Sequence, residues 1–278
     1  MLIFVLILVL ALGSALWFVL MPVVRRRRRL AWARLPAPAE WGDWLRAHIP
    51  FYECIPTSLR DRLHALMQIF VREKAYVGCN GLVVTDEMRV VIAAYACLLV
   101  VNRPGVPRSH FYDELMSILV YPTAFIVHES DEQGGIVTEG HRVLSGQAWD
   151  VRRIILSWED VQDAASDHVN VVLHEFAHYL DMEDEAMDGA PGLGSAADYE
   201  EWSSTFWEEY ERLADEVDAG RETLLDPYAA TEPAEFFAVA TETFFHQPRE
   251  LLAAHPKLYE QLTKYYRLDP ASWAVSKV

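Results

Sequence analysis

Cysteine and basic residues are both scarce in this chain of 278 residues. Its 3 cysteines, Cys54, Cys79 and Cys97, are odd in number and show no paired spacing, which argues against a disulfide framework and favours a reducing compartment. Lysine and arginine together number 24 against 41 acidic residues, so the formal net charge is −17. This balance argues against nucleic acid as a partner. Internal repeats and low-complexity tracts are absent as well.

Charge is also missing from the start of the chain. Residues 2–24 form 23 consecutive uncharged positions, and as a helix they would extend about 34 Å, enough to cross a hydrocarbon core of about 30 Å. A buried core helix is the alternative, but the length and the terminal position favour a transmembrane helix. Five arginines, Arg25 to Arg29, follow the apolar run instead of preceding it, which argues against a cleaved signal peptide.

The same arginines predict how the chain is oriented. Because arginines stay on the cytoplasmic side, we expect a single-pass protein of the inner (cytoplasmic) membrane with the rest of the chain in the cytoplasm. Beyond the first 35 residues the chain has 18 basic and 41 acidic residues, a balance of −23. The arginine cluster is therefore expected to favour anionic lipid headgroups, which the acidic body would avoid. Residues 25–40, basic and then proline-containing, are expected to act as a linker with a semi-extended end.

One domain is expected over residues 41–270, mainly helical with a small sheet, and therefore of the α+β class. Hydrophobic periodicity predicts helices over residues 57–76, from a cap at Thr85 to about Val101, from a cap at Ser195 past Val217, and around residues 248–267. Short strands are expected at residues 123–128, 136–138, 141–144 and 151–158.

Residues His174 to His178 read HEFAH, within the longer stretch VVLHEFAHYLD. On an α-helix, positions i and i+4 lie above one another on one face, so both imidazoles can reach one tetrahedral metal ion. Glu175 then projects beside the metal, where it can accept a proton from a water that the metal acidifies. Apolar neighbours predict a buried helix, with Ser166 or Asp167 as its N-cap. The alternative is a buried histidine pair without a metal; the whole pattern favours a catalytic zinc ion.

A catalytic zinc site needs a third protein ligand. The extended signature of one zincin group would place Gly at 181 and His at 184, but this chain has Asp181 and Asp184. The residues leave two sources open: Asp184 itself, or a glutamate on a second helix. The downstream stretch DPYAATEPAEFFAVATETFF predicts such a helix, with Thr231 as its N-cap and with Glu235 and Glu242, seven residues apart, near one side. Each glutamate could equally be a solvated surface residue.

These segments carry a resemblance. Together with LSGQAWDVRRIILSWEDV, the two stretches resemble the Mlc titration factor A family of bacterial zinc peptidases over roughly residues 50 to 270. The motifs HEFAH and YAATEPAEFFA are also similar to the catalytic domain of anthrax lethal factor. The resemblance implies a zincin-like fold, one Zn²⁺ per chain, Glu235 as the third ligand beside His174 and His178, and peptide or protein substrates. Endopeptidase and aminopeptidase activity both stay open.

The resemblance also places a tyrosine at Tyr228, seven residues before Glu235. A phenol hydroxyl opposite the metal can donate a hydrogen bond to the oxyanion of the attacked carbonyl; a packing role is the alternative. Asp181, three residues after His178, is predicted to accept a hydrogen bond from the imidazole N–H of a ligand histidine, or else to end the helix in an acidic loop.

The predicted function is therefore a membrane-anchored zinc metallopeptidase whose general base is Glu175. A rival function follows from the family's name: a binding module that sequesters a transcriptional regulator of sugar uptake, with peptidase activity secondary. Residues 181–201, acidic and glycine-containing, are expected to be a solvated connection, with a mobile cover over the cleft as the alternative. The strand near residues 145–149 is a candidate for pairing with the substrate backbone.

Overall fold

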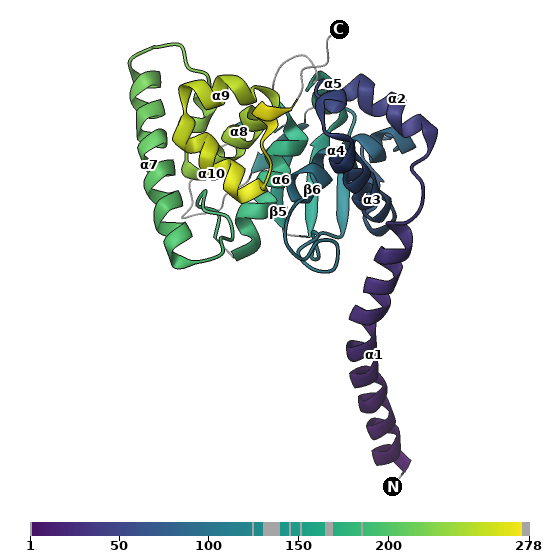
Figure 1. Cartoon of the computed structure of the whole chain (residues 1–278). Helices are drawn as coiled ribbons and strands as arrows, with labels where there is room; N and C mark the ends of the chain where they lie inside the picture. Colours follow the sequence, from purple (N-terminus) through teal and green to yellow (C-terminus); the bar gives the residue numbers. More distant parts are fainter. Residues whose placement is uncertain are drawn as a thin grey trace.

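The computed structural model describes residues 2–123, 125–129, 140–144, 146–150, 152–164, 169–184 and 186–273. It is mainly helical, with one small sheet and a separate two-stranded ribbon (Figure 1). The helices are α1 (Leu2–Trp32), α2 (Ala39–His48), α3 (Thr57–Glu73), α4 (Asp86–Val100), α5 (Trp158–Asp163), α6 (Val171–Asp181), α7 (Ala196–Asp218), α8 (Pro233–His246), α9 (Pro248–Ala254) and α10 (Pro256–Tyr266). The strands are β1 (Ala75–Gly78), β2 (Ser117–Tyr121), β3 (Phe125–Glu129), β4 (Gly140–Leu144), β5 (Gly146–Asp150) and β6 (Arg153–Ser157).

The four-stranded sheet has the order β1-β2-β6-β5. The first three strands are parallel, with Ile118 of β2 opposite Ile154 of β6, and β5 pairs antiparallel to β6 at the edge. The two central strands bury alternate side chains, among them Val120 and Leu156, with no exposed surface. The connection from β1 to β2 contains α4, and α6 packs against β5 and β6, so helices bury these short strands and their side chains are apolar.

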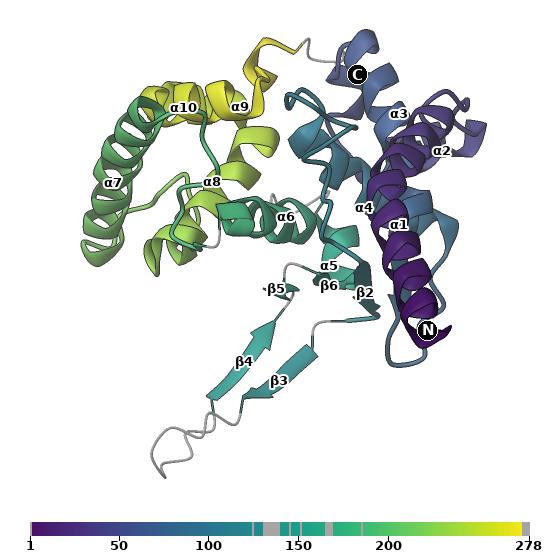
Figure 2. The same cartoon turned by 90° about the horizontal axis from the view of Figure 1, so that it is seen from below.

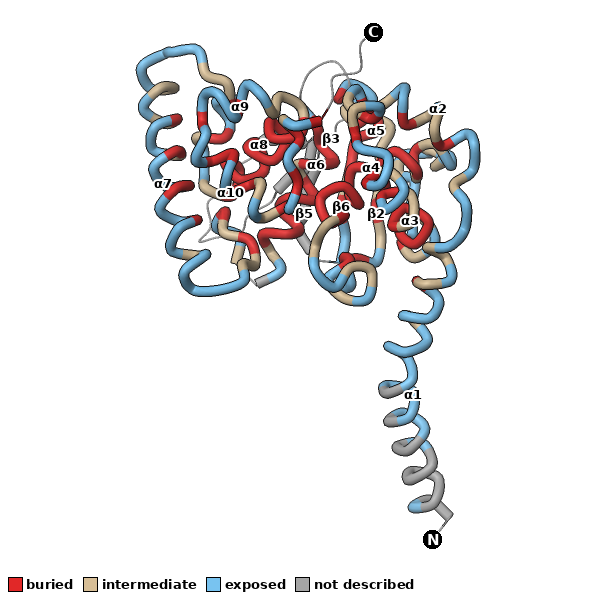
Figure 3. The backbone as a smooth tube through the Cα atoms, in the orientation of Figure 1, coloured by how far each residue is buried: buried red, intermediate tan, exposed pale blue. Residues whose placement is uncertain are grey.

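Helix α6 is the element that joins the two halves of the domain. It packs against α4, β5 and β6 on one side and against α8 on the other. In Figure 1 the sheet and helices α2 to α4 lie to one side of α6, and helices α7 to α10 lie to the other. Figure 3 shows the buried backbone concentrated in this middle region, so a polar group on α6 is placed inside the protein.

Several helix boundaries follow the local sequence. The Thr85 hydroxyl accepts a hydrogen bond from the Met88 N–H at 3.2 Å, which confirms the predicted cap of α4. The Ser195 hydroxyl accepts from the Asp198 N–H at 3.2 Å and starts α7 as predicted. Helices α9 and α10 lie within the range predicted at the end of the domain. Helix α3 differs from its prediction because it ends at Glu73, and the next residues form β1.

The strand predictions agree in part. Strands β3, β4 and β6 lie within one or two residues of the predicted ranges, whereas the predicted strand at 136–138 lies outside the described residues. Strands β1 and β2 and helices α2 and α5 were not predicted. Strands β3 and β4 pair antiparallel as a ribbon that projects from the body of the domain (Figure 2).

The N-terminal segment is one long helix. Helix α1 continues through all five arginines to Trp32, with Pro22 inside it, and α2 begins at Ala39. The helical arginines differ from the predicted linker over residues 25–40, because the non-helical connection is limited to residues 33–38. Of the helices in the part of the chain that the structure describes, none has both the length and the apolar character of a membrane span.

Candidate metal centre

The HEFAH motif lies on α6, which is buried along nearly its whole length. The side chain of Asn170 caps the helix by accepting a hydrogen bond from the Leu173 N–H at 2.9 Å. The predicted caps, Ser166 and Asp167, lie outside the described residues. The helix surrounds its polar triplet with apolar residues that are at most 5% exposed: Val171, Val172, Leu173, Phe176, Ala177 and Leu180. The motif is thus held by packing and does not move freely at a surface.

The glutamates of the second segment lie on α8, which packs along α6. Pro233 occupies the first turn, where its missing N–H costs no hydrogen bond. The N-cap position is Glu232, and the Thr231 hydroxyl instead donates to the Tyr228 carbonyl at 2.7 Å. The prediction of Thr231 as the cap was therefore wrong. Glu235 and Glu242 are both buried, so neither is a solvated surface residue.

Three side chains meet between these helices. Glu235 Oε2 lies 3.0 Å from His174 Nε2 and 3.4 Å from His178 Nε2, and the two Nε2 atoms are 3.1 Å apart. Ligands of a tetrahedral zinc ion at 2.0 to 2.1 Å would stand about 3.3 Å from one another. The spacing, the nitrogen and oxygen donors and the burial therefore fit one zinc ion. These three form the group of potential metal ligands found among the described residues.

Asp184, the other candidate for a third ligand, lies in the short turn Met182–Asp184 that follows α6. Its side chain is outside those the structure describes. The carboxylate oxygen beside the two imidazoles belongs to Glu235 on α8.

Glu242 holds the outer nitrogen of a histidine. Its Oε1 lies 2.8 Å from His174 Nδ1, and its Oε2 accepts a hydrogen bond from the Asn170 N–H. Asn170 in turn lies 3.2 Å from His246 through its amide nitrogen. A carboxylate on Nδ1 fixes the tautomer that leaves Nε2 as the free lone pair for a metal. From the sequence, Glu242 was a candidate ligand or a solvated surface residue, although its spacing of seven from Glu235 already placed both on one side of α8.

Asp181, predicted for the role of imidazole partner, makes a different contact in the structure. Its Oδ2 accepts a hydrogen bond from the Gly189 N–H at 2.9 Å. Gly189 has φ +79°, and a Cβ there would meet the Pro233 carbonyl oxygen at 2.4 Å. Its own carbonyl accepts from the Trp202 indole at 2.9 Å. The acidic loop therefore contacts α6, α7 and the start of α8 at Gly189. These contacts argue against residues 181–201 moving together as a mobile cover over the cleft.

Glu175 is 4% exposed, and its Oε2 has no hydrogen-bond partner among the residues that the structure describes. Burial raises the pKa of this carboxyl to about 8, and the nearby carboxylates Glu235 and Glu242 add to the effect while His174 opposes it. A divalent cation at the three ligand atoms would act in the opposite direction. An unpartnered, buried carboxyl beside a ligand cluster is an expensive arrangement that a purely structural role does not require.

The pKa values of the two imidazoles shift in opposite directions. Burial would lower the pKa of His174, but its hydrogen bonds to Glu235 and Glu242 raise it well above the ordinary value. Burial lowers the pKa of His178, against the effect of Glu235. Those same hydrogen bonds lower the pKa of the Glu235 carboxyl despite its burial. Protons on these groups balance the negative charge of the carboxylates. A bound metal cation would balance that charge directly.

Tyr228 lies at the edge of this cluster. It belongs to the short turn Pro227–Ala230, where Asp226 accepts from the Tyr228 N–H at 2.8 Å. Its ring centroid is 6.4 Å from that of His174, and the residue is 51% exposed. A tyrosine that packed into the core would not remain half exposed, so the position suits a group that meets a ligand from the solvent side.

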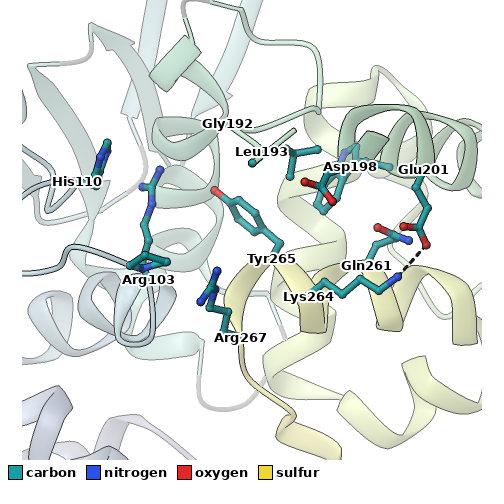
Figure 4. A pocket seen from close by; sticks show the side chains of 13 residues that line it. Arg103, His110, Gly192, Leu193, Asp198, Glu201, Gln261, Lys264, Tyr265 and Arg267 are labelled. Atoms are coloured by element: carbon teal, nitrogen blue, oxygen red, sulfur yellow. Dashed lines mark hydrogen bonds and ion pairs between the residues drawn. The ribbon is translucent and has the colours of Figure 1, made fainter. Parts of the chain in front are cut away.

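A separate cavity of about 440 Å³ lies among α7, α10 and the segments near Arg103 and Leu193. Figure 4 shows Tyr265 and Arg103 on one side of it and the ion pair of Lys264 with Glu201 on the other. None of the six predicted site residues lines it. The chemistry of the HEFAH cluster therefore does not extend into this cavity.

The chain is similar to a known family and to known proteins over most of its length. A family model described as glucose-regulated metallo-peptidase M90 matches residues 23–267. The Synechocystis protein called "Uncharacterized protein slr2042" is 43% identical over 240 residues, which cover 84% of this chain and 86% of that protein. Mlc titration factor A of Serratia proteamaculans is 34% identical over 237 residues, covering 84% of this chain and 88% of the relative. Its namesake in Yersinia pestis is 32% identical, covering 84% and 85%.

Proposed function

Because the chain belongs to the glucose-regulated metallo-peptidase M90 family, we propose that it is a zinc-dependent metallopeptidase whose metal is held by His174, His178 and Glu235. The family membership confirms the resemblance to Mlc titration factor A, and the mainly helical domain with its small sheet is compatible with a metallopeptidase. The observation that carries the proposal is the convergence of two imidazoles and a carboxylate within 4.8 Å of one another beside the unpartnered Glu175.

Zinc would supply Lewis acidity, polarising a peptide carbonyl and acidifying a water molecule. Glu175 would take a proton from a water molecule and return it to the leaving amine. Its burial keeps the carboxyl away from bulk water, so the proton stays within the site. Glu242 keeps His174 in the tautomer whose Nε2 lone pair faces the cluster, through the contact of 2.8 Å on Nδ1.

Tyr228 would donate its hydroxyl to the carbonyl oxygen on which negative charge develops. A half-exposed ring beside His174 supports this role, because it can close on a substrate without leaving its turn. The edge strand β5 packs against α6, and in the described part of the chain β6 is its one strand partner. A peptide can therefore pair with its free edge and run past the zinc helix.

We further propose that residues 2–24 anchor the protein in the inner membrane, with the domain in the cytoplasm. Support comes from 23 uncharged residues followed by five arginines, because moving those arginines across a bilayer is far costlier than retaining them. Protease added to intact cells is then expected to leave the domain whole and to digest it once the membrane is opened. Digestion in intact cells would place the peptidase outside the cytoplasm.

A second candidate function is regulator binding. The relatives at 34% and 32% identity are called Mlc titration factor A, which says that they titrate Mlc, so this chain is a candidate to sequester a transcriptional regulator. The two functions separate in a Glu175→Gln protein. A pure binding module keeps its cellular effect when hydrolysis is lost, whereas a peptidase loses it.

The decisive experiment measures metal and hydrolysis on the full chain. Purified protein is expected to hold about one zinc per chain and to cleave a peptide library. Libraries with free and blocked amino termini separate aminopeptidase from endopeptidase activity. Glu175→Gln is expected to retain the metal yet lose on the order of 10² to 10⁴ in rate, as for other general bases. The exposed Glu211→Gln on α7 is the matched control, and full activity in zinc-free protein would overturn the proposal.

A further inference from the structure

The end of α1 is clamped to the domain by two arginines one helical turn apart. Arg29 Nε lies 2.8 Å from Glu73 Oε2, and its Nη2 lies 2.8 Å from Asp113 Oδ1. Arg25 reaches the same two carboxylates, at 2.7 and 2.8 Å. The Arg29 side chain is only 2% exposed. A guanidinium so buried, with both partners in place, makes this end of the helix part of the folded domain.

The clamp also fixes the segment before β2. Arg29 Nη1 donates to the Pro107 carbonyl at 2.9 Å, and its guanidinium carbon lies 5.3 Å from the Phe111 ring centroid. Lys74, next to Glu73, donates to the Leu115 carbonyl at 2.8 Å. Residues 107–115 and the end of α1 therefore form one rigid base.

The remaining arginines of the cluster face outward. Arg26, Arg27 and Arg28 are exposed, as is Arg108, which follows the carbonyl that Arg29 binds. Arg28 lies over the Trp32 ring at 4.7 Å. No ion pair joins any of these four guanidinium groups to the residues that the structure describes. We call these four residues the arginine collar. In a chain of net charge −17, they concentrate positive charge at the base of one helix.

The distance from the uncharged segment to the clamp is short. Val24 and Arg29 are five residues apart on one continuous helix, or about 7 Å along its axis. Figure 1 shows α1 leaving the domain as a projecting helix, with its base beside α3. If residues 2–24 lie in a bilayer, the chain has no flexible spacer that would hold the domain away from the lipid headgroups.

We propose that the arginine collar binds the anionic headgroups of a phospholipid bilayer and docks the domain on the membrane in one orientation. This inference rests on the proposed membrane attachment. Lipid is favoured over an acidic protein as the partner because the collar directly adjoins the uncharged part of α1. If that part lies in the bilayer, it holds the collar at the level of the headgroups. Within a few ångströms of an anionic surface each cation strengthens association by about 5-fold, and four together can offset the repulsion of the acidic body.

Hydrogen exchange on the full chain in vesicles tests the proposal. Two vesicle types are used, phosphatidylcholine alone and phosphatidylcholine mixed with phosphatidylglycerol. The amides of residues 103–110 are expected to exchange several-fold more slowly in the anionic vesicles. Arg108→Glu changes the charge by two, and Arg26→Gln, Arg27→Gln and Arg28→Gln together change it by three, so each variant is expected to abolish most of that difference. Arg108 is the cleaner variant because it lies outside the segment that sets membrane topology.

The controls separate the possible failures. Arg62→Gln with Arg221→Gln removes two exposed arginines outside the collar and is expected to keep the protection. Peptide hydrolysis by Arg108→Glu is expected to match the wild type, which shows that the variant is folded. Equal exchange in the two vesicle types, or protection that survives Arg108→Glu, overturns docking and leaves an acidic protein as the occupant. Failure of the wild-type chain to float with either vesicle contradicts the membrane attachment itself, while zinc content and hydrolysis report separately on the peptidase.

Discussion

Replacing Glu242 by glutamine tests how the metal centre is held. The two oxygens of Glu242 accept from two donors, His174 Nδ1–H and the Asn170 N–H. A glutamine amide has one oxygen that accepts and one nitrogen that only donates, so it can satisfy one of them at most. The other donor then faces the side-chain NH₂ group of the glutamine, which cannot accept a hydrogen bond. Glu242→Gln is nearly isosteric, and its effect is therefore one of hydrogen bonding and charge.

The structure allows the magnitude to be estimated. A buried donor that loses its acceptor costs about 1 to 3 kcal/mol. If the amide keeps the Asn170 contact, His174 loses the group that fixes its tautomer, and zinc affinity is expected to fall 10- to 100-fold, which equals about 1.4 to 2.8 kcal/mol. If it keeps the His174 contact, the start of α6 loses a hydrogen bond and the free energy of unfolding falls instead. In either case, the combined loss in the free energies of zinc binding and of unfolding is expected to be similar.

Two measurements test the Glu242→Gln variant. Competition with a chelator gives the zinc dissociation constant, and chemical unfolding of the metal-free protein gives the free energy of unfolding. Asp181→Asn is the matched control, since it makes the same chemical change on α6 but at a carboxylate that binds Gly189. Its zinc affinity is expected to stay close to that of the wild type. Loss of zinc affinity in Asp181→Asn, with none in Glu242→Gln and no loss of stability, would refute the assignment of Glu242.

Three further predictions follow from the same structure. Glu235→Ala is expected to weaken zinc binding at least about 10-fold and Asp184→Ala to leave it nearly unchanged, and the reverse result in a chelator titration would move the third ligand to the turn after α6. Tyr228→Phe is expected to lower kcat by roughly 10- to 10³-fold with metal content and KM little changed, whereas an unchanged kcat would return the ring to packing. Burial lowers the pKa of Lys74 to about 8 from 10.5, so the unfolded chain binds a proton that the folded protein lacks between these values. Stability relative to Lys74→Met should therefore rise with pH across that window, by up to about 3 kcal/mol, and a flat difference in unfolding experiments would contradict this.

The sequence by itself determined the features that depend on local spacing. The i, i+4 histidines specify a shared helix face whatever surrounds the helix, and the structure places both beside one carboxylate. The caps at Thr85 and Ser195 were predictable because a cap is a contact between residues three apart. The uncharged run over residues 2–24 is likewise a property of consecutive residues.

The tertiary structure decided what depends on residues far apart in the chain. A choice between Asp184 and Glu235 by chemistry alone was not possible, since both offer the same carboxylate; the packing of α8 on α6 brings Glu235 to the imidazoles. The same packing gives the His174 Nδ1 contact to Glu242, 68 residues away, while Asp181 on the zinc helix binds the loop. In the sequence the five arginines form one cluster. The fold divides this cluster, because Glu73 and Asp113 bind the arginines on one face of α1 and leave the other face to solvent. Spacing along the chain is fixed by the backbone, whereas the partner of a buried charge is fixed by which elements pack together.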